Sequence, residues 1–331
     1  MTHALRSAVL VAAAIALAAA CSSAKTTDVG AESDTTTSAA TSGTAGSGTV
    51  VNVWTAPGSV DPTALPMGDH QVTTTTPAVG IVFRCGSGGG VGGAAVDGPW
   101  IHGSTYDRTA KVHVQGDVAW PGANFRVTVA DGTRTIVTDD LPVETHTGTF
   151  PITASDPAHA YDQNPNKISE SATTVELPVE PTAAASPTCL SPGAIGVLAN
   201  GVFLFDALDG EQRDAVAHET QDLCDGHPAP GDQYHYHDIP SCLANAATGS
   251  STVVGWAYDG YPIVVERDAA GNLPTDADLD ECHGRTGPVL VDGQVVTTYH
   301  YSATLEFPYT LGCFHGTSAV SSGGPSRGGP G

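Results

Sequence analysis

The first half of the chain alternates hydrophobic and polar residues, which is the pattern of strands with one buried face. The alternation is clear at Val51–Trp54, Lys111–Val114 and Phe125–Val129. Asp131-Gly132, a dipeptide typical of two-residue hairpin turns, stands before the strand-like run Thr135–Val137. We therefore expect this half to be rich in short strands, with a hairpin at Asp131-Gly132.

The second half combines one helical segment with further strands. Residues 210–223 are predicted to form a helix, with Asp209 as its N-cap and Asp225-Gly226 at its end. Further strands are predicted at Thr252–Ala257, Ile263–Glu266, Val289–Val291 and Val295–Tyr301. The pattern as a whole predicts an α+β, β-rich fold of mostly antiparallel strands with one or a few short helices.

The two ends of the chain have compositions that do not suit a packed core. The apolar run Ala8–Ala20 is too short to span a bilayer and is typical of a secretory signal peptide. Small residues directly before Cys21 indicate lipoprotein processing, in which this cysteine receives a lipid; the alternative is an ordinary signal peptide with an incidental cysteine. We expect a lipoprotein signal peptide over 1–21, a disordered Ser/Thr/Ala-rich tether over 22–49 and a disordered tail over 318–331. The protein would then be extracytoplasmic, with its lipid as the membrane anchor.

Six cysteines remain when Cys21 is set aside, and an exported protein is free to form disulfides. Six cysteines allow 15 pairings. We expect Cys224–Cys242, which brackets the Tyr/His motif described below, and Cys282–Cys313, which leaves Cys85–Cys189. None of the six lies in a C-x-x-C pair, which argues against thiol redox catalysis and a Cys-rich zinc site.

Acidic residues greatly outnumber basic ones. Thirty-five Asp and Glu against 12 Lys and Arg give a formal net charge of −23. Nucleic-acid binding depends on basic side chains, so no nucleic-acid partner is expected. The charge is compatible with a bound divalent cation, and the sequence names no small-molecule or surface partner.

The most informative motif is Gln233-Tyr234-His235-Tyr236-His237-Asp238. On a strand, His235 and His237 share one face, about 7 Å apart, and Tyr234 and Tyr236 share the other. Two imidazoles at this spacing can bind one metal ion. The alternative is a pair of histidines whose hydrogen bonds are satisfied within the protein.

Other histidines lie near this motif in the sequence. A second Tyr-His-Tyr stands at Tyr299-His300-Tyr301, and we expect His300 to complete a three-histidine site if the two strands approach. His283 and His227 are the next candidates. Three imidazoles with an open position suit zinc, copper or iron. The tyrosines beside the histidines are candidates for orienting a bound water or substrate.

Two acidic features are candidate supporting groups. His218 and Asp222 lie four residues apart on the predicted helix and share a face, as a ligand and its hydrogen-bond partner would; surface residues are the alternative. Asp278 and Asp280 belong to an acidic run that begins at Asp276. Glu281 stands where an EF-hand loop has its glycine, so calcium is less favoured than a transition metal. The run is expected to supply a single oxygen ligand or a hydrogen-bond partner of a ligand, and solvated loop charges are the alternative.

Several sequence blocks occur together in one order: Thr145–Gly148, Asn164–Asn166, Ala199–Val202, Asp214–Glu219, Cys224–Pro228, Tyr234–His237, Asp278–Gly284 and Phe307–Phe314. With these blocks the chain resembles the YHYH-domain family of bacterial secreted proteins and lipoproteins. The resemblance implies a YHYH domain over 141–317 and adds His146 to the candidate ligands. Residues 50–140 lie outside the resemblance, and their alternating pattern predicts a β-rich N-terminal region. In the family pattern a histidine often follows the second Tyr-His-Tyr, where this chain has Ser302.

We therefore expect a lipid-anchored extracytoplasmic protein with a His/Tyr-rich, metal-binding domain, which is either an enzyme of unassigned reaction or a binding protein. One alternative is a non-catalytic surface module for a glycan or peptide. Another is a purely structural domain. Geometry distinguishes them, because a metal centre requires the histidines to converge beside a cavity, whereas a structural role leaves them scattered.

Overall fold

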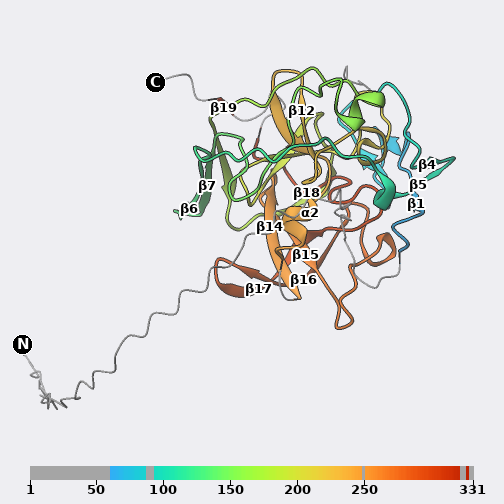
Figure 1. Ribbon diagram of the computed structural model, residues 1–331. Coiled ribbons are helices and arrows are strands. Elements are labelled where there is room, and N and C mark those ends of the chain that lie inside the picture. Colours follow the sequence, from blue (N-terminus) through green and yellow to red (C-terminus); the bar gives the residue numbers. More distant parts are fainter. Residues whose placement is uncertain (1–59, 87–92, 248–249, 321–325, 328–331) are drawn as a thin grey trace, which may run out of the picture. The chain divides into compact units, whose positions relative to one another are not determined.

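Strands dominate the part of the chain that the computed structural model describes, residues 60–86, 93–247, 250–320 and 326–327 (Figure 1). The strands are β1 (Leu65–Pro66), β2 (Val72–Thr73), β3 (Val82–Phe83), β4 (Ile101–His102), β5 (Thr105–Tyr106), β6 (Phe125–Ala130), β7 (Thr133–Thr138), β8 (Thr173–Pro178), β9 (Ala183–Thr188), β10 (Ala194–Leu198), β11 (Phe203–Phe205), β12 (Gly226–Ala229), β13 (Gln233–Tyr236), β14 (Ser251–Ala257), β15 (Pro262–Glu266), β16 (Gly284–Val291), β17 (Gln294–Ser302), β18 (Phe314–Gly316) and β19 (Ser326–Arg327). The helices are α1 (Ala215–His218) and α2 (Ser241–Ala244), with 3-10 turns at η1 (Arg108–Ala110), η2 (Pro157–Ala160) and η3 (Asp276–Asp278). The expected α+β, β-rich fold of mostly antiparallel strands is confirmed.

The predictions for the ends of the chain fall mostly outside the described residues. This holds for the signal peptide, the tether and the strand expected at Val51–Trp54. Within the predicted tail, β19 pairs with β8, so at least this short part is attached to a sheet. The described residues all fall within one compact unit, Thr49–Gly331, and the division proposed at residue 140 stays a prediction.

The hairpin expected at Asp131-Gly132 is confirmed. Strands β6 and β7 pair in antiparallel register from Phe125 opposite Thr138 to Ala130 opposite Thr133. The two turn residues both have positive φ, 50° at Asp131 and 75° at Gly132, as a type I′ turn requires.

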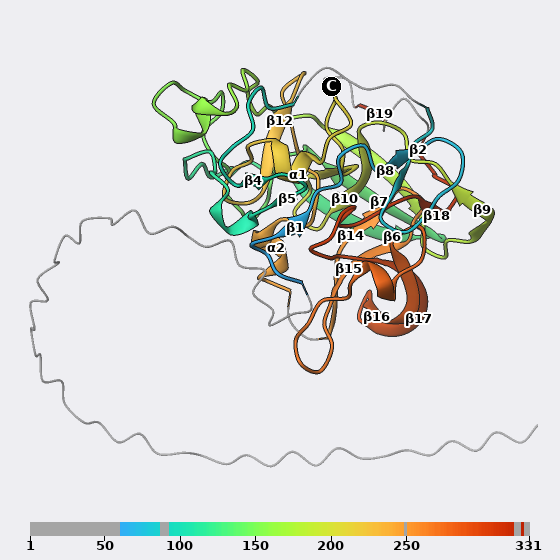
Figure 2. The same cartoon turned by 90° about the vertical axis from the view of Figure 1, so that its right-hand side faces the viewer.

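The eight-stranded main sheet consists of two halves with the same topology, which we call the first repeat (β10–β13) and the second repeat (β14–β17). The strand order is β12-β13-β11-β10-β14-β15-β17-β16. From the centre of the sheet outward, each half places its first, second, fourth and third strand in that order. In each repeat the first two strands are antiparallel, the last two form a hairpin, and the second and fourth are parallel. Figure 2 shows β16 and β17 as a strongly curled hairpin at one end of the sheet.

Residue-level registers support this internal symmetry. Val197 of β10 lies opposite Trp256 of β14, at the antiparallel junction of the two repeats. The turn after each of these strands contains a left-handed glycine, Gly201 with φ 90° and Gly260 with φ 92°. Val197 and Trp256 are 59 positions apart, and so are the two glycines, so Val197 and Trp256 occupy equivalent positions in the two repeats. Because these two residues also lie opposite each other, an approximate two-fold axis passes between them.

Two sequence predictions about secondary structure are wrong. The helix expected over 210–223 is limited to α1, because the side chain of Asp214, and not that of Asp209, accepts the capping hydrogen bond from Ala217. The backbone becomes extended at Glu219, which ends the helix (ψ 145°). No strand forms at Lys111–Val114, where pairing is limited to one bridge from Val114 to Asp222.

The predicted disulfide pairing is confirmed. Cys85–Cys189, Cys224–Cys242 and Cys282–Cys313 are all bonded. The second brackets the β12–β13 hairpin and the third links the second repeat to the segment before β18. Both hairpins are therefore covalently fixed beside the core.

Candidate metal centre

Three histidines converge on one face of the β12–β13 hairpin. His227 on β12 lies directly opposite His235 on β13, and His237 follows two residues later on the same face. The ring centroids are 4.5 Å apart for His227–His235 and 4.8 Å for His235–His237. One nitrogen of each ring lies within 4.8 Å of the other two, and all three side chains are buried. The expected convergence of His235 and His237 is therefore observed, with His227 as the third member.

The hydrogen bonds on the far side of two rings fix where their protons are. The Nδ1 atom of His237 lies 2.6 Å from the carbonyl oxygen of Asp206, and Nδ1 of His235 lies 3.2 Å from that of Gln233. A carbonyl oxygen only accepts, so both Nδ1 atoms carry hydrogen. When the rings are neutral, both Nε2 atoms hold lone pairs, and these atoms face each other at 3.0 Å. Facing lone pairs repel unless a proton or a cation lies between them.

A buried carboxylate completes the cluster. Oε2 of Glu219, directly after α1, is 3.2 Å from Nε2 of His227 and 3.3 Å from Nε2 of His237. This oxygen and both ring nitrogens of His227 are buried without a hydrogen-bond partner. Ligands that are about 2.0–2.1 Å from a tetrahedral metal ion lie roughly 3.3 Å from one another. The spacing and the unpaired atoms therefore fit a metal-binding site.

The electrostatics of the cluster suit a cation. Burial, together with the charges of His227 and His237, holds the pKa of His235 well below its ordinary value, which keeps that ring neutral. Burial opposes ionisation of Glu219, but His227 and His237 nevertheless hold its pKa well below the ordinary value. Burial also opposes charging of His237, yet the nearby Glu219 carboxylate, 3.3 Å from its Nε2, raises the pKa of His237. The buried negative charge thus requires a positive one beside it.

The centre opens onto a cavity of about 540 Å³. His227, His235, His237 and Glu219 all line this cavity. Phe205 forms another part of the wall and stacks on His235, with ring centroids 4.0 Å apart. A ligand in the cavity would therefore meet the histidine cluster directly.

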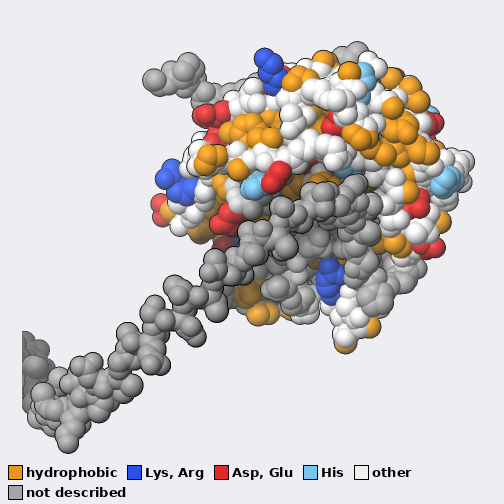
Figure 3. Space-filling view, in the orientation of Figure 1, with side chains coloured by type: hydrophobic (Ala, Val, Ile, Leu, Met, Phe, Trp, Pro, Cys, Tyr) orange, Lys and Arg blue, Asp and Glu red, His pale blue; other side chains and the backbone are white. Residues whose placement is uncertain are grey.

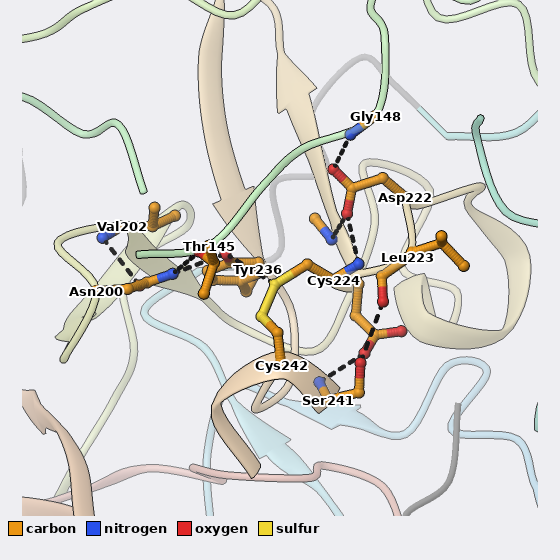
Figure 4. Close-up of a disulfide and its surroundings, with 12 residues drawn as sticks. Thr145, Gly148, Asn200, Val202, Asp222, Leu223, Cys224, Tyr236, Ser241 and Cys242 are labelled. Carbon is orange, nitrogen blue, oxygen red and sulfur yellow. Dashed lines mark hydrogen bonds between the residues drawn. A yellow bond between two sulfur atoms is a disulfide. The ribbon is translucent and has the colours of Figure 1, made fainter. Parts of the chain in front are cut away.

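The opposite face of the hairpin is structural (Figure 4). Tyr236 receives a hydrogen bond from Asn200 (2.9 Å) and lies 3.7 Å from the sulfur of Cys224. Tyr234 donates to Asp222 at 2.8 Å. Both tyrosines are fully buried away from the histidines, so the expectation that they orient a water or substrate is wrong.

Asp222 has a different role from the predicted one. It accepts hydrogen bonds from the backbone N–H groups of Gly148 (2.7 Å) and Cys224 (2.9 Å), besides Tyr234. Burial raises its pKa to about 6. Because α1 ends at His218, Asp222 does not share a helical face with that histidine, which instead lies between Asp69 and Asp97.

The other predicted ligands do not reach the centre. Four strands separate β17 from β13 in the sheet, which places His300 about 24 Å away at a strand spacing of about 4.8 Å. His300 instead contacts Glu266 at 3.2 Å. Nε2 of His283 is hydrogen-bonded to the hydroxyl of Thr304 at 3.0 Å, and Nδ1 of His146 is hydrogen-bonded to the Asp117 carboxylate.

The remaining supporting candidates stabilise turns of the second repeat. Tyr299 donates to Asp280 (3.0 Å), and Tyr301 donates to Asp259 (2.5 Å). Asp278 accepts the backbone N–H of Thr275 and caps η3, so the acidic run is not arranged as a calcium loop.

Two residues that form part of the candidate metal centre were not predicted from the sequence. Glu219 stands next to His218 in one of the blocks of the resemblance, and its place directly before the histidine hairpin was the available signal. Asp206 acts through its backbone carbonyl, which no sequence pattern reveals.

The comparisons with known proteins agree with this picture. The family described as YHYH protein matches residues 174–272, which include both repeats' central strands and the histidine hairpin. This part of the chain is therefore a YHYH domain. No curated protein and no solved structure matches the chain. No helix among the described residues is long and apolar enough to cross a membrane, and the three disulfides fit an extracytoplasmic protein.

Proposed function

We propose that the YHYH domain is a transition-metal centre, in which His227, His235 and His237 bind the ion through Nε2 and Glu219 is the fourth ligand. The observation that carries this proposal is a set of buried acceptor atoms that converge on one point. Nε2 of His235 lies 3.0 Å from Nε2 of His237, and Oε2 of Glu219 lies 3.3 Å from Nε2 of His237. Oε2 of Glu219 and both ring nitrogens of His227 are buried without a hydrogen-bond partner.

The donor set selects the class of metal. Three imidazoles and one carboxylate suit zinc, copper or iron, whereas calcium requires mostly oxygen ligands. A bound ion of this class would supply Lewis-acid or redox chemistry at the floor of the cavity. The protein's own contribution is to hold the rings, since carbonyl oxygens of Gln233 and Asp206 fix the orientation of His235 and His237.

We further propose that the protein is held at the cell membrane through a lipid on Cys21. The apolar run before this cysteine and the disulfides of the mature domain support export. The polar tether over 22–49 would then leave the centre accessible outside the cytoplasm.

Calorimetric titration of the chelator-treated chain with zinc and with copper tests the metal proposal. We expect one equivalent to bind, and the His235→Ala/His237→Ala variant to lose this binding while it stays folded by circular dichroism. The matched control is His300→Ala, which removes the histidine of the other Tyr-His-Tyr and should leave the stoichiometry unchanged. No uptake by the folded wild-type chain would contradict the proposal.

A further inference from the structure

The walls of the cavity above the metal centre are mostly carbon. Beyond the centre itself they include Phe205 and four prolines, Pro165, Pro192, Pro228 and Pro230. Proline has no N–H, so these residues offer a ligand ring carbons and no hydrogen-bond donors. A volume of about 540 Å³ is in the range of small-molecule sites, which is about 300–1,000 Å³.

Outside the metal centre, the carboxylates in the wall, Asp162 and Asp209, already accept hydrogen bonds from within the protein. Asp162 accepts hydrogen bonds from the backbone of Asn164 (2.9 Å) and the hydroxyl of Thr220 (3.0 Å). Asp209 accepts from the backbone of Glu211 (2.8 Å) and from Nε of Arg213 (2.9 Å). Neither is arranged to select a cationic ligand, because its oxygens are directed at these partners.

The wall also lacks an unmatched positive charge. Among the described residues, Arg84 is the only Lys or Arg that lines the cavity. Its Nη2 lies 2.5 Å from Oδ1 of Asp206 and its Nε 3.2 Å from Oδ2, in a pair that is almost fully buried. Basic side chains are also sparse on the face of the molecule shown in Figure 3. In the metal-free chain, an anionic ligand would therefore meet Asp162, Asp209 and Glu219, and the described residues that line the cavity offer no free cation to offset them.

From this balance we propose that the cavity binds an uncharged, largely apolar organic molecule of about the size of a two-ring compound, next to the histidine cluster. The assignment deepens the proposed function, since it names the class of molecule that the metal centre would meet. Phe205 supplies the main flat contact surface, and the Arg84–Asp206 pair makes the wall neutral beside it. Aromatic and proline surfaces stabilise such ligands mainly through the apolar area that they bury.

Two probes of equal shape and different charge test the proposal: 2-naphthamide and 2-naphthoate. Each is titrated into the metal-free full chain by calorimetry, so that direct coordination of the carboxylate cannot contribute. We expect naphthamide to bind at least tenfold more tightly than naphthoate. Naphthoate binding that equals or exceeds naphthamide binding would overturn the proposal, as would no detectable naphthamide binding at millimolar concentration.

Variants locate the probe and test the charge balance. Phe205→Ala should weaken naphthamide binding at least fivefold, whereas Phe150→Ala, which alters a separate cavity of about 280 Å³, should not change it. Asp206→Asn keeps the carbonyl that holds His237 but leaves Arg84 unmatched, so naphthoate should bind at least fivefold more tightly. Equal effects of the two Phe variants would place the probe elsewhere and overturn the assignment.

Zinc uptake is measured on a separate sample of the same preparation, so that the probes still meet the metal-free chain. A chain that takes up no zinc but ranks the probes as predicted would contradict the metal centre and support the cavity assignment. A chain that takes up zinc and prefers naphthoate in its metal-free form would contradict the cavity assignment alone.

Discussion

The two repeats of the main sheet use one local structure for two different purposes. In both, a Tyr-His-Tyr strand packs its tyrosines in an edge-on pair with ring centroids 5.4 Å apart. In both, the first tyrosine covers a glycine of the neighbouring strand: a Cβ at Gly226 would lie 2.2 Å from the hydroxyl of Tyr234, and one at Gly284 would lie 2.3 Å from that of Tyr299. The shared scaffold is therefore the tyrosine face.

The histidine faces differ. Opposite His235 the first repeat has His227, whereas opposite His300 the second repeat has Arg285. His237 of the first repeat corresponds to Ser302 of the second. Each histidine face also holds one buried carboxylate, Glu219 or Glu266.

The comparison shows how each carboxylate obtains its positive partner. In the second repeat Arg285 binds Glu266 through Nη2 (2.7 Å) and Nε (2.9 Å), and Ser302 adds a hydrogen bond at 2.5 Å. Burial opposes ionisation, but hydrogen bonds from His300, Arg285 and Ser302 lower the pKa of Glu266 to about 2. In the first repeat, the described residues place the imidazoles of His227 and His237, and no Lys or Arg, in ion-pair contact with Glu219. We infer that the metal ion takes the place that a guanidinium occupies in the second repeat.

Replacing the two differing side chains should convert the second repeat into a metal site. The Arg285→His/Ser302→His variant restores three histidines beside Glu266, and we expect zinc stoichiometry to rise from one equivalent to two. Elemental analysis after gel filtration measures it. If the folded variant still binds one zinc ion per chain, the histidine faces of the two repeats are not equivalent.

The disulfides of the two repeats should differ in their effect on metal affinity. Cys224–Cys242 closes an 18-residue separation that contains the three histidine ligands, and closing a loop of this length is worth about 3 kcal/mol in the chain-entropy account. We expect Cys224→Ser/Cys242→Ser to weaken zinc binding by up to about 100-fold. Competition titration against a chelator measures the change. Cys282→Ser/Cys313→Ser is the control and should lower stability without a comparable loss of affinity.

The two carboxylates should separate function from stability. Glu219→Gln removes the charged fourth ligand and should weaken zinc binding about tenfold, because a charge-assisted contact is worth about 1.5 kcal/mol or more. Glu266→Gln should leave zinc affinity unchanged and lower the free energy of unfolding, because Arg285 loses its partner. Weaker zinc binding in Glu266→Gln, with unchanged zinc binding in Glu219→Gln, would contradict the account. Calorimetry and urea unfolding measure the two quantities.

The last expected effect, on the pH dependence of stability and not on metal binding, concerns the residue between cysteine and glycine, which is Asp225 in the first repeat and His283 in the second. Both have positive φ, 62° and 68°. Burial lowers the pKa of His283 to about 3, so below pH 6.5 the unfolded chain binds a proton that the folded chain does not. Stability should therefore fall as pH falls from about 6.5, by up to about 1.4 kcal/mol per pH unit from this group. His283→Asn tolerates the positive φ and should make the decline less steep in urea unfolding between pH 6.5 and pH 4.5; an unchanged slope would contradict this.

The sequence predicted local features better than their arrangement. The alternation in β6, the hairpin turn after it and the common face of His235 and His237 all follow from short patterns. The disulfide pairing was predicted from the order of the cysteines along the chain, with Cys85–Cys189 as the remaining pair. The choice of His300 over His227 was wrong because identical Tyr-His-Tyr tripeptides suggested proximity, whereas they mark equivalent positions at opposite ends of one sheet. The repeat itself is hidden in the sequence, since the loops differ in length: equivalent positions are 59 residues apart at Gly201 and 65 at His235.

X-ray absorption at the metal edge of the zinc-loaded chain tests the central claim most directly. The account predicts a first shell of about four light ligands at about 2.0–2.1 Å, with the outer-shell scattering of three imidazoles, and a loss of that imidazole signal in the His235→Ala/His237→Ala variant. A shell made only of oxygen ligands, or an imidazole signal that persists in this variant, would contradict the claim that His227, His235 and His237 form the metal centre.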